Sequence, residues 1–244
     1  MSIKTTLNYS PNFNLKKRAK KDIKFIIFHY TGMKSEKIAI KRLTEIQSEV
    51  SSHYFIKKNG EIVTLVPDLY TAWHAGISYW KKFTNLNKNS IGIEIHNPGH
   101  QFGYKNFSKK QINSLVRLSN FLIKEYKINN KYILGHSDAA PLRKKDPGEK
   151  FPWEYLSKYK IGFWHKLNQK YLSSIRKQRV NNLDKKNTLK NIFKIGYSDF
   201  FKNKFTKEKK TALIIKAFQR RFRPKLVNGK IDKECLIIAK NLAN

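Results

Sequence analysis

The chain contains little cysteine and no long apolar run. Cys235 is the only cysteine among 244 residues, which excludes an intramolecular disulfide framework and a multi-cysteine zinc or iron–sulfur cluster. No stretch approaches the roughly 18 consecutive apolar residues that a membrane-spanning helix needs. We therefore expect no transmembrane segment, a core position for Cys235, and metal ligands, if any, from His, Asp or Glu.

The beginning of the chain lacks the apolar segment of a secretory signal and an early cysteine that could carry a lipid. Lysines and an arginine occupy most of positions 16–21 instead. From these absences we expect a cytoplasmic location.

Acidic side chains are also scarce, because 17 Asp and Glu stand against 51 Lys and Arg, for a formal net charge of +34. Such a charge attracts polyanions. Only 9 of the basic residues are arginine, however, and no base-reading motif accompanies Arg220, Arg221 and Arg223, so we expect no nucleic-acid partner. A compositional preference for solvated lysine explains the charge equally well.

Hydrophobic residues make up 40% of the chain and aromatic residues 13%, which is enough for a folded core. The apolar run 24–30 predicts a strand buried on both faces. The run 91–95 predicts a strand with Gly92 and Glu94 on the face opposite three isoleucines. Residues 132–134 predict another strand, which ends at Gly135-His136.

Local signals predict the elements between these strands. Residues 36–46 have helical spacing, and residues 108–126 combine a capping box with a long amphipathic pattern. Residues 53–66 predict a hairpin, because Asn59-Gly60 suits the positive φ values of a type I′ turn. Residues 137–153 predict a loop directly after a strand, where functional groups concentrate.

The C-terminal part differs in charge and pattern. Residues 161–244 carry 22 basic and 5 acidic residues, and three short helical patterns lie near 188–195, 207–222 and 232–242. We predict an α/β fold with a mixed central sheet flanked by helices, followed by a small all-α domain of three helices. The expected boundaries are an N-terminal extension 1–23, a first domain 24–165, a basic linker 166–187 and the helical domain 188–244.

Two histidines, His29 and His136, lie at the ends of predicted strands. Strand ends at one sheet edge converge in space, and Asp146 follows ten residues after His136. Two imidazoles and one carboxylate are typical of a catalytic zinc site, in which water takes the fourth position. The spacing alone is weak evidence, because a histidine at a strand end is more often a structural residue that only makes hydrogen bonds. We expect His96, His100 and His165 to be structural or at the surface.

Short motifs around these positions occur in the order of a known family. They cover roughly residues 24–155 and together resemble the type 2 zinc N-acetylmuramoyl-L-alanine amidases, the family that includes AmiD, AmpD and the peptidoglycan recognition proteins. The motifs are His29-Tyr30-Thr31-Gly32, Ser51-Ser52-His53-Tyr54, Ala72-Trp73-His74-Ala75-Gly76, Ser90-Ile91-Gly92-Ile93-Glu94, Gly135-His136-Ser137-Asp138, Asp146-Pro147-Gly148 and Phe151-Pro152-Trp153.

The resemblance implies that residues 24–165 form a zinc amidase domain. Such an enzyme hydrolyses the amide bond between N-acetylmuramic, or 1,6-anhydro-N-acetylmuramic, acid and L-alanine in peptidoglycan or muropeptides. The implied zinc ligands are His29, His136 and Asp146. Zinc would supply a Lewis acid for this reaction.

The resemblance also implies a catalytic acid/base at Glu94 and an oxyanion-stabilising cation at Lys144. A carboxylate in an apolar strand is costly unless it is used or paired, which favours this role for Glu94.

Five further motif residues are expected to bind substrate. Trp73 and His74 would line the sugar or peptide groove, with a packed structural corner as the alternative. For His53 and Tyr54, a substrate-binding role and a structural role are equally open. Arg143 would bind a stem-peptide carboxylate or be a solvated charge.

The C-terminal part resembles, less specifically, the peptidoglycan-binding modules that follow AmiD-type catalytic domains. The residues that carry this resemblance are Ala217-Phe218-Gln219, Phe222-Arg223-Pro224 and Asn228-Gly229-Lys230. A structural cap on the first domain is the alternative. If this part binds the wall, a periplasmic or wall-associated location is the alternative to the expected cytoplasmic one.

A recognition protein without catalysis is the competing function, although all the implied catalytic positions are filled. We expect a monomer.

Overall fold

The computed structural model describes residues 3–198 and 204–244. Its centre is a six-stranded sheet in the order β1-β5-β4-β9-β3-β10. Strands β4 and β5 pair antiparallel, while β9, β3 and β10 run parallel, so the sheet is mixed as predicted. The strands are β1 (Thr6–Leu7), β5 (Ile62–Thr64), β4 (Tyr54–Ile56), β9 (Ser90–Ile95), β3 (Phe25–Tyr30) and β10 (Ile133–Gly135).

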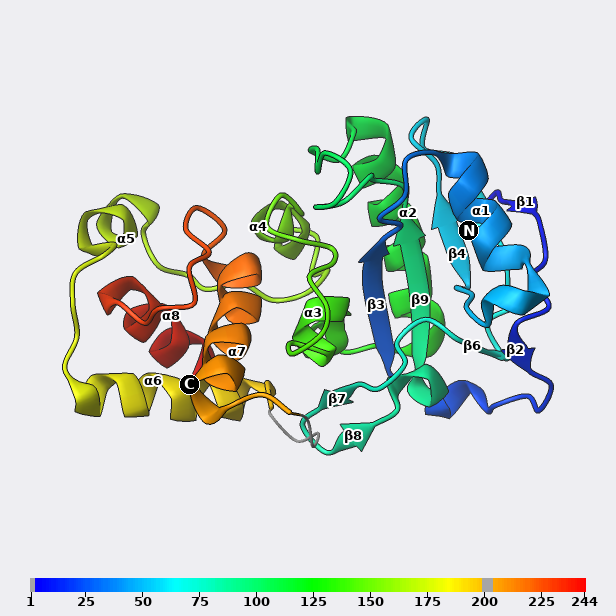
Figure 1. Cartoon of the computed structure of the whole chain (residues 1–244). Helices are drawn as coiled ribbons and strands as arrows, with labels where there is room; N and C mark the ends of the chain where they lie inside the picture. The colour runs from blue at the N-terminus through cyan, green and yellow to red at the C-terminus, as the bar shows by residue number, and fades with distance from the viewer. Residues whose placement is uncertain (1–2, 199–203) are drawn as a thin grey trace.

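Two small ribbons and a series of helices surround the sheet. Figure 1 shows the sheet in one half of the molecule and helices α5 to α8 in the other, with α3 and α4 between them. The ribbons pair β2 (Phe13–Asn14) with β6 (Thr71–Ala72) and β7 (Tyr79–Trp80) with β8 (Phe83–Thr84). The helices are α1 (Glu36–Thr44), α2 (Lys109–Tyr126), α3 (His136–Ala139), α4 (Trp153–Ser157), α5 (Gln169–Ile175), α6 (Asn182–Ile195), α7 (Lys207–Phe222) and α8 (Lys233–Ala243), with short 3-10 turns at Lys20–Asp22, Ile46–Ser48, Leu86–Asn89 and Asn130–Tyr132.

Helix α2 covers one face of the sheet. Its Leu115, Leu118 and Leu122 join a buried cluster with Ile91 and Ile93 of β9. The predicted capping box is present, because Ser108 Oγ accepts from the backbone N–H of residue 111 and the Gln111 side chain accepts from the backbone N–H of residue 108. The period-2 pattern of β9 thus leaves Gly92 and Glu94 on the opposite face.

The opposite face joins a second buried cluster. Phe25 and Ile27 of β3 belong to it together with side chains from the C-terminal helices, including Phe218 of α7 and Ile238 of α8. Residues 25–29 of the predicted run 24–30 are therefore buried on both faces, as predicted. Cys235 is fully buried in the same cluster, which confirms its core position.

The hairpin turn between β4 and β5 differs from the predicted type I′ turn. Gly60 has a φ of 87°, whereas Asn59 is not in the positive-φ region. The register pairs Ile56 with Ile62, and the backbone N–H of Gly60 donates to the Lys57 carbonyl at 2.9 Å. The loop is thus longer than two residues, and one left-handed glycine is enough to close it.

The predicted basic linker, 166–187, contains helical structure. Helix α5 lies inside it and α6 begins there at Asn182, because Leu172 and Ile175 are buried while the lysines face solvent. Residues 1–2 of the predicted extension and 199–203 of the predicted helical domain lie outside the described residues. No helix in the described part is long and apolar enough to cross a membrane.

Candidate metal centre

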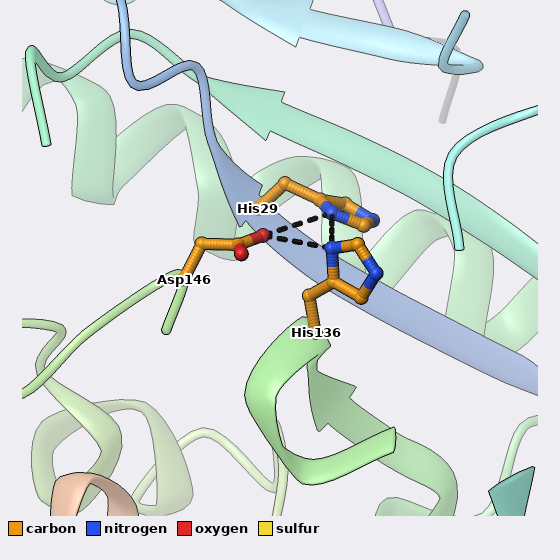
Figure 2. Close-up of side chains that lie close together, drawn as sticks. All are labelled: His29, His136 and Asp146. Atoms are coloured by element: carbon orange, nitrogen blue, oxygen red, sulfur yellow. Dashed lines mark hydrogen bonds and ion pairs between the residues drawn. The ribbon is translucent and has the colours of Figure 1, made fainter. Parts of the chain in front are cut away.

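Three predicted ligands meet at the carboxyl end of neighbouring parallel strands. His29 lies on β3, His136 begins α3 directly after β10, and Asp146 lies in the following loop. Figure 2 shows the three side chains turned toward one another. His29 Nδ1 lies 2.9 Å from His136 Nδ1 and 3.1 Å from Asp146 Oδ2, and His136 Nδ1 lies 3.0 Å from the same oxygen.

This triangle of donor atoms fits a small divalent ion. Ligands about 2.0–2.2 Å from a tetrahedral ion lie roughly 3.3 Å apart, so a small outward movement would admit the ion. His29, His136 and Asp146 are 1%, 3% and 8% exposed, which excludes most of the water that would otherwise compete. The three residues therefore form a buried group that could hold a metal ion.

Hydrogen bonds leave both ligating nitrogens free of protons. His136 Nε2 donates to the Ala75 carbonyl at 3.0 Å, so Nδ1 carries the lone pair. His29 Nε2 lies 3.0 Å from His74 Nδ1 and donates to it, which orients the His29 lone pair toward the metal site. Outer hydrogen bonds of this kind fix the tautomer and the ring of a ligand.

The His74 ring is itself held by a short chain of hydrogen bonds. Ser90 Oγ donates to the Leu86 carbonyl at 2.6 Å and accepts from His74 Nε2 at 3.2 Å. His74 Nδ1 is therefore an acceptor for His29. Because the chain ends on a backbone carbonyl, each proton position in it is determined.

Electrostatics favour the ligating forms. Burial, and then the neighbouring His136, lower the pKa of His29 to about 4. Burial alone would raise the pKa of Asp146, but the nearby His136 and His29 outweigh it and hold that pKa well below its usual range. At neutral pH the site thus holds a neutral His29 and an ionised Asp146.

Glu94 lies beside this centre on a rigid strand. It is the register partner of His29 across the β3–β9 pair. Its Oε2 is buried and has no hydrogen-bond partner among the described residues. Burial and the charge of Asp146 raise the pKa of Glu94 to about 8, against the opposing effect of Lys144. A buried carboxylate without a partner is costly, and here it faces a pocket.

That pocket has a volume of about 390 Å³. The metal ligands and Glu94 line it together with Trp73, His74, Arg143 and Lys144, so the structure brings these sequence-predicted residues together. Trp73 is fixed by its Nε1, which donates to Asn14 Oδ1 at 2.6 Å. Arg143 donates through Nε and Nη2 to the Ile77 carbonyl, at 3.0 and 2.8 Å, and so also supports the loop after His74.

His53 and Tyr54, for which the sequence left substrate site and scaffold open, lie outside this pocket. Both are buried, and neither lines the pocket. His53 Nδ1 accepts from the Gly92 N–H at 2.9 Å, and its Nε2 lies 3.0 Å from the Tyr70 carbonyl. Tyr54 belongs to the core cluster under α2. These contacts favour the scaffold alternative for both residues.

His100 lines the pocket, although the sequence predicts a structural or surface residue. Tyr30 Oη lies 2.8 Å from His100 Nδ1, and Glu149 Oε2 lies 3.1 Å from its Nε2. The sequence offers one signal for this, because His100 follows β9, the strand that carries Glu94, at the same sheet edge as His29 near the end of β3.

Two imidazoles and one carboxylate would leave a position of a tetrahedral ion for water, and the carboxylate of Glu94 lies next to it. Fold and site therefore define a metal-dependent hydrolase. A family profile for N-acetylmuramoyl-L-alanine amidases matches residues 19–149. The chain belongs to the N-acetylmuramoyl-L-alanine amidase family, which confirms the resemblance.

Relatives of known structure extend beyond the first domain. The chain is 36% identical over 232 residues to the amidase AmiD of Escherichia coli, covering 90% of this chain and 82% of AmiD. A structure of AmiD with an anhydro-N-acetylmuramic acid tripeptide substrate superposes with a TM-score of 0.77 at 34% identity, over 94% of this chain and 91% of AmiD. AmpDh3 of Pseudomonas aeruginosa, in complex with anhydromuramic pentapeptide, gives a TM-score of 0.77 at 29% identity over 95% of each chain.

Proposed function

We propose that the protein is a zinc-dependent amidase that cleaves the bond between N-acetylmuramic acid, or its 1,6-anhydro form, and L-alanine in muropeptides. The observation that carries this proposal is the buried His29, His136 and Asp146 group with Glu94 as the register partner of His29. Family membership and the ligands of AmiD and AmpDh3 support the substrate class.

Zinc suits the donor set, because imidazole nitrogen and carboxylate oxygen are its usual ligands in catalytic sites. When bound, the ion supplies a Lewis acid for the scissile carbonyl and for water. His29, His136 and Asp146 would hold it, and Ala75 and His74 would hold the two imidazoles in the ligating tautomer.

Glu94 moves the protons in this proposal. Its Oε2 is free of other hydrogen bonds among the described side chains and backbone groups, so the ionised form of Glu94 can take a proton from the attacking water and pass it to the leaving amine of L-alanine. Because β9 is paired on both sides, by β3 and β4, the carboxylate is held in place. General acid–base catalysis of this kind contributes roughly 10²–10⁴-fold to the rate.

Lys144 supplies positive charge at the pocket. It lines the pocket and lowers the pKa of both Glu94 and His29, so its ammonium group acts on the place where the amide is cleaved. A cation there stabilises the negative charge that develops on the carbonyl oxygen. Arg42, Arg143 and Lys145 also line the pocket and would attract the carboxylates of a stem peptide.

Mass spectrometry tests the proposal. Purified protein is incubated with soluble anhydro-muropeptides and with intact sacculi, with and without a chelator. Release of free stem peptide that the chelator abolishes is the expected result, and the faster substrate distinguishes recycling from wall remodelling. Asp146→Ala should lose metal and activity together. Bound metal without cleavage of either substrate would overturn the proposal and favour a recognition protein.

The location stays a prediction. We propose the cytoplasm, with the periplasm or cell wall as the alternative, and cell fractionation with immunodetection decides between them.

A further inference from the structure

An arginine of the C-terminal helices reaches the first domain. Arg221 lies on α7 and is 1% exposed. Its Nη1 donates to Asp138 Oδ2 at 2.6 Å, and its Nη2 donates to the Ile133 carbonyl at 3.1 Å. The guanidinium carbon lies 4.0 Å from the centre of the Trp153 ring. A fixed planar cation therefore connects α7 with β10, α3 and α4.

Asp138, the partner of Arg221, has both carboxylate oxygens engaged. Oδ2 also accepts from the Gly135 N–H at 2.8 Å, and Oδ1 accepts from Tyr197 Oη at 2.5 Å. Tyr197 follows α6 and is 2% exposed. Two of the three groups that hold Asp138 thus come from the C-terminal helices.

Asp138 lies on the same turn of helix as a metal ligand. Helix α3 has four residues, His136 to Ala139, which is too short to be stable without tertiary contacts. His136 supplies one donor atom of the metal site. The next residue, Ser137, donates its backbone N–H to the Asp146 carbonyl at 2.8 Å. A displacement of α3 would therefore move two of the three ligands.

The arginines near the end of α7 face inward. Arg220, Arg221 and Arg223 are 8%, 1% and 1% exposed. Arg223 Nη1 donates to Asp232 Oδ2 at 2.6 Å, inside the helical region, whereas Arg221 crosses to the first domain. The end of α7, which carries part of the resemblance to wall-binding modules, therefore has its arginines buried, where a polymer cannot contact them.

We propose that Arg221 is a positioning residue of the metal site. Through the buried ion pair with Asp138 it fixes α3, and α3 fixes His136 and the backbone of Asp146. The C-terminal helices then act as a structural part of the catalytic centre, whatever else they bind. This inference rests on the proposed function in one respect, since it takes His29, His136 and Asp146 as the metal ligands.

The test compares two arginines of one segment in the full chain. Arg221→Met removes the ion pair to α3 and leaves an uncompensated buried carboxylate. Arg223→Met is the matched control, because it removes an equally buried arginine whose partner Asp232 lies within the helical region. Zinc dissociation constants are measured by competition with a chromophoric chelator, at a temperature where circular dichroism shows each variant folded.

We expect Arg221→Met to weaken zinc binding at least 10-fold and Arg223→Met less than 2-fold. Asp138→Asn should weaken it as well, and combining it with Arg221→Met should add little. Arg221→Lys, which keeps a charge near Asp138, should restore part of the affinity. Unchanged zinc binding by Arg221→Met, or an equal loss in Arg223→Met, would overturn the proposal.

A second variant keeps the proposal testable if Arg221→Met does not fold. Tyr197→Phe removes the hydrogen bond to Asp138 Oδ1. A loss of zinc affinity of at least 2-fold in this variant would support the proposal, and wild-type affinity would overturn it. Failure of the proposed function is visible independently, in the wild-type protein, as zinc binding without release of stem peptide. The zinc measurement uses no peptidoglycan substrate, so it does not depend on that result.

Discussion

The imidazole of His74 lies directly against the backbone of Gly92. A Cβ atom on residue 92 would come within 2.4 Å of His74 Cγ and 2.5 Å of its Cδ2. The glycine in the middle of β9 is therefore required by a side chain, because its φ is not in the left-handed region. It allows the ring that orients His29 to approach the sheet.

Gly92→Ala should weaken metal binding because it displaces His74 and removes the acceptor for His29 Nε2. Loss of an outer-shell partner typically costs 10–100-fold in metal affinity, and we expect a loss in that range by chelator competition. Gly103→Ala is the control, since a Cβ there meets no atom within 4 Å, although its φ of 86° strains the backbone. Equal zinc affinity in Gly92→Ala and wild type would show that His74 does not orient His29.

Glu94→Gln should abolish most activity while it leaves the metal in place. The amide has the shape of the carboxylate but cannot carry the proton, so we expect kcat to fall by about 10²–10⁴-fold. Metal content, measured by atomic emission, should stay at the wild-type level. Glu61→Gln, which changes an exposed carboxylate outside the pocket, serves as the control. A fully active Glu94→Gln would exclude the acid–base role.

Removal of the metal should lower the stability of the protein. A ligand at about 100 times its Kd stabilises the native state by about 2.7 kcal/mol, which for a chain of this size raises Tm by about 5–10 °C. Calorimetry of the chelated and zinc-loaded forms measures this shift. Asp146→Ala should show no zinc-dependent shift, and a shift of the same size in that variant would place the metal elsewhere.

The thiol of Cys235 should be unreactive in the native protein. It is fully buried, and burial raises its pKa to about 12. Since an unfolded cysteine has a pKa of about 8.5, only the unfolded chain loses this proton as pH rises above that value, so the thiol's contribution to stability falls between about pH 8.5 and 12. Labelling with a thiol reagent at pH 8 should be slow without denaturant and fast with it. Rapid labelling of the native protein would contradict the buried position, and Cys235→Ser gives the background.

Local patterns in the sequence predict much of the fold. The apolar run that became β3, the alternation of β9 and the capping box of α2 depend on neighbouring residues, so the sequence alone predicts them. The type I′ turn failed as a prediction because the β4–β5 register, a property of the whole sheet, left a longer loop. The sequence did not predict helix α5, because its two buried apolar residues, Leu172 and Ile175, stand in a mostly polar and basic stretch.

For the candidate site too, the sequence predicts some residues and only the tertiary structure shows the role of others. The motifs alone named His29, His136, Asp146 and Glu94, because metal and proton chemistry restrict the residue types that can serve. Only the tertiary structure favours the scaffold alternative for His53 and shows that His74 holds His29, since a ring at either position is compatible with the same motif.

The contact between Arg221 and Asp138 joins residues 83 positions apart, and nothing in the chain between them indicates it. The sequence by itself therefore determined the chemistry available to this protein, through residue types and short-range pattern. Which of those side chains support one another was decided by packing, because burial and ion pairing depend on distances that only the folded chain sets.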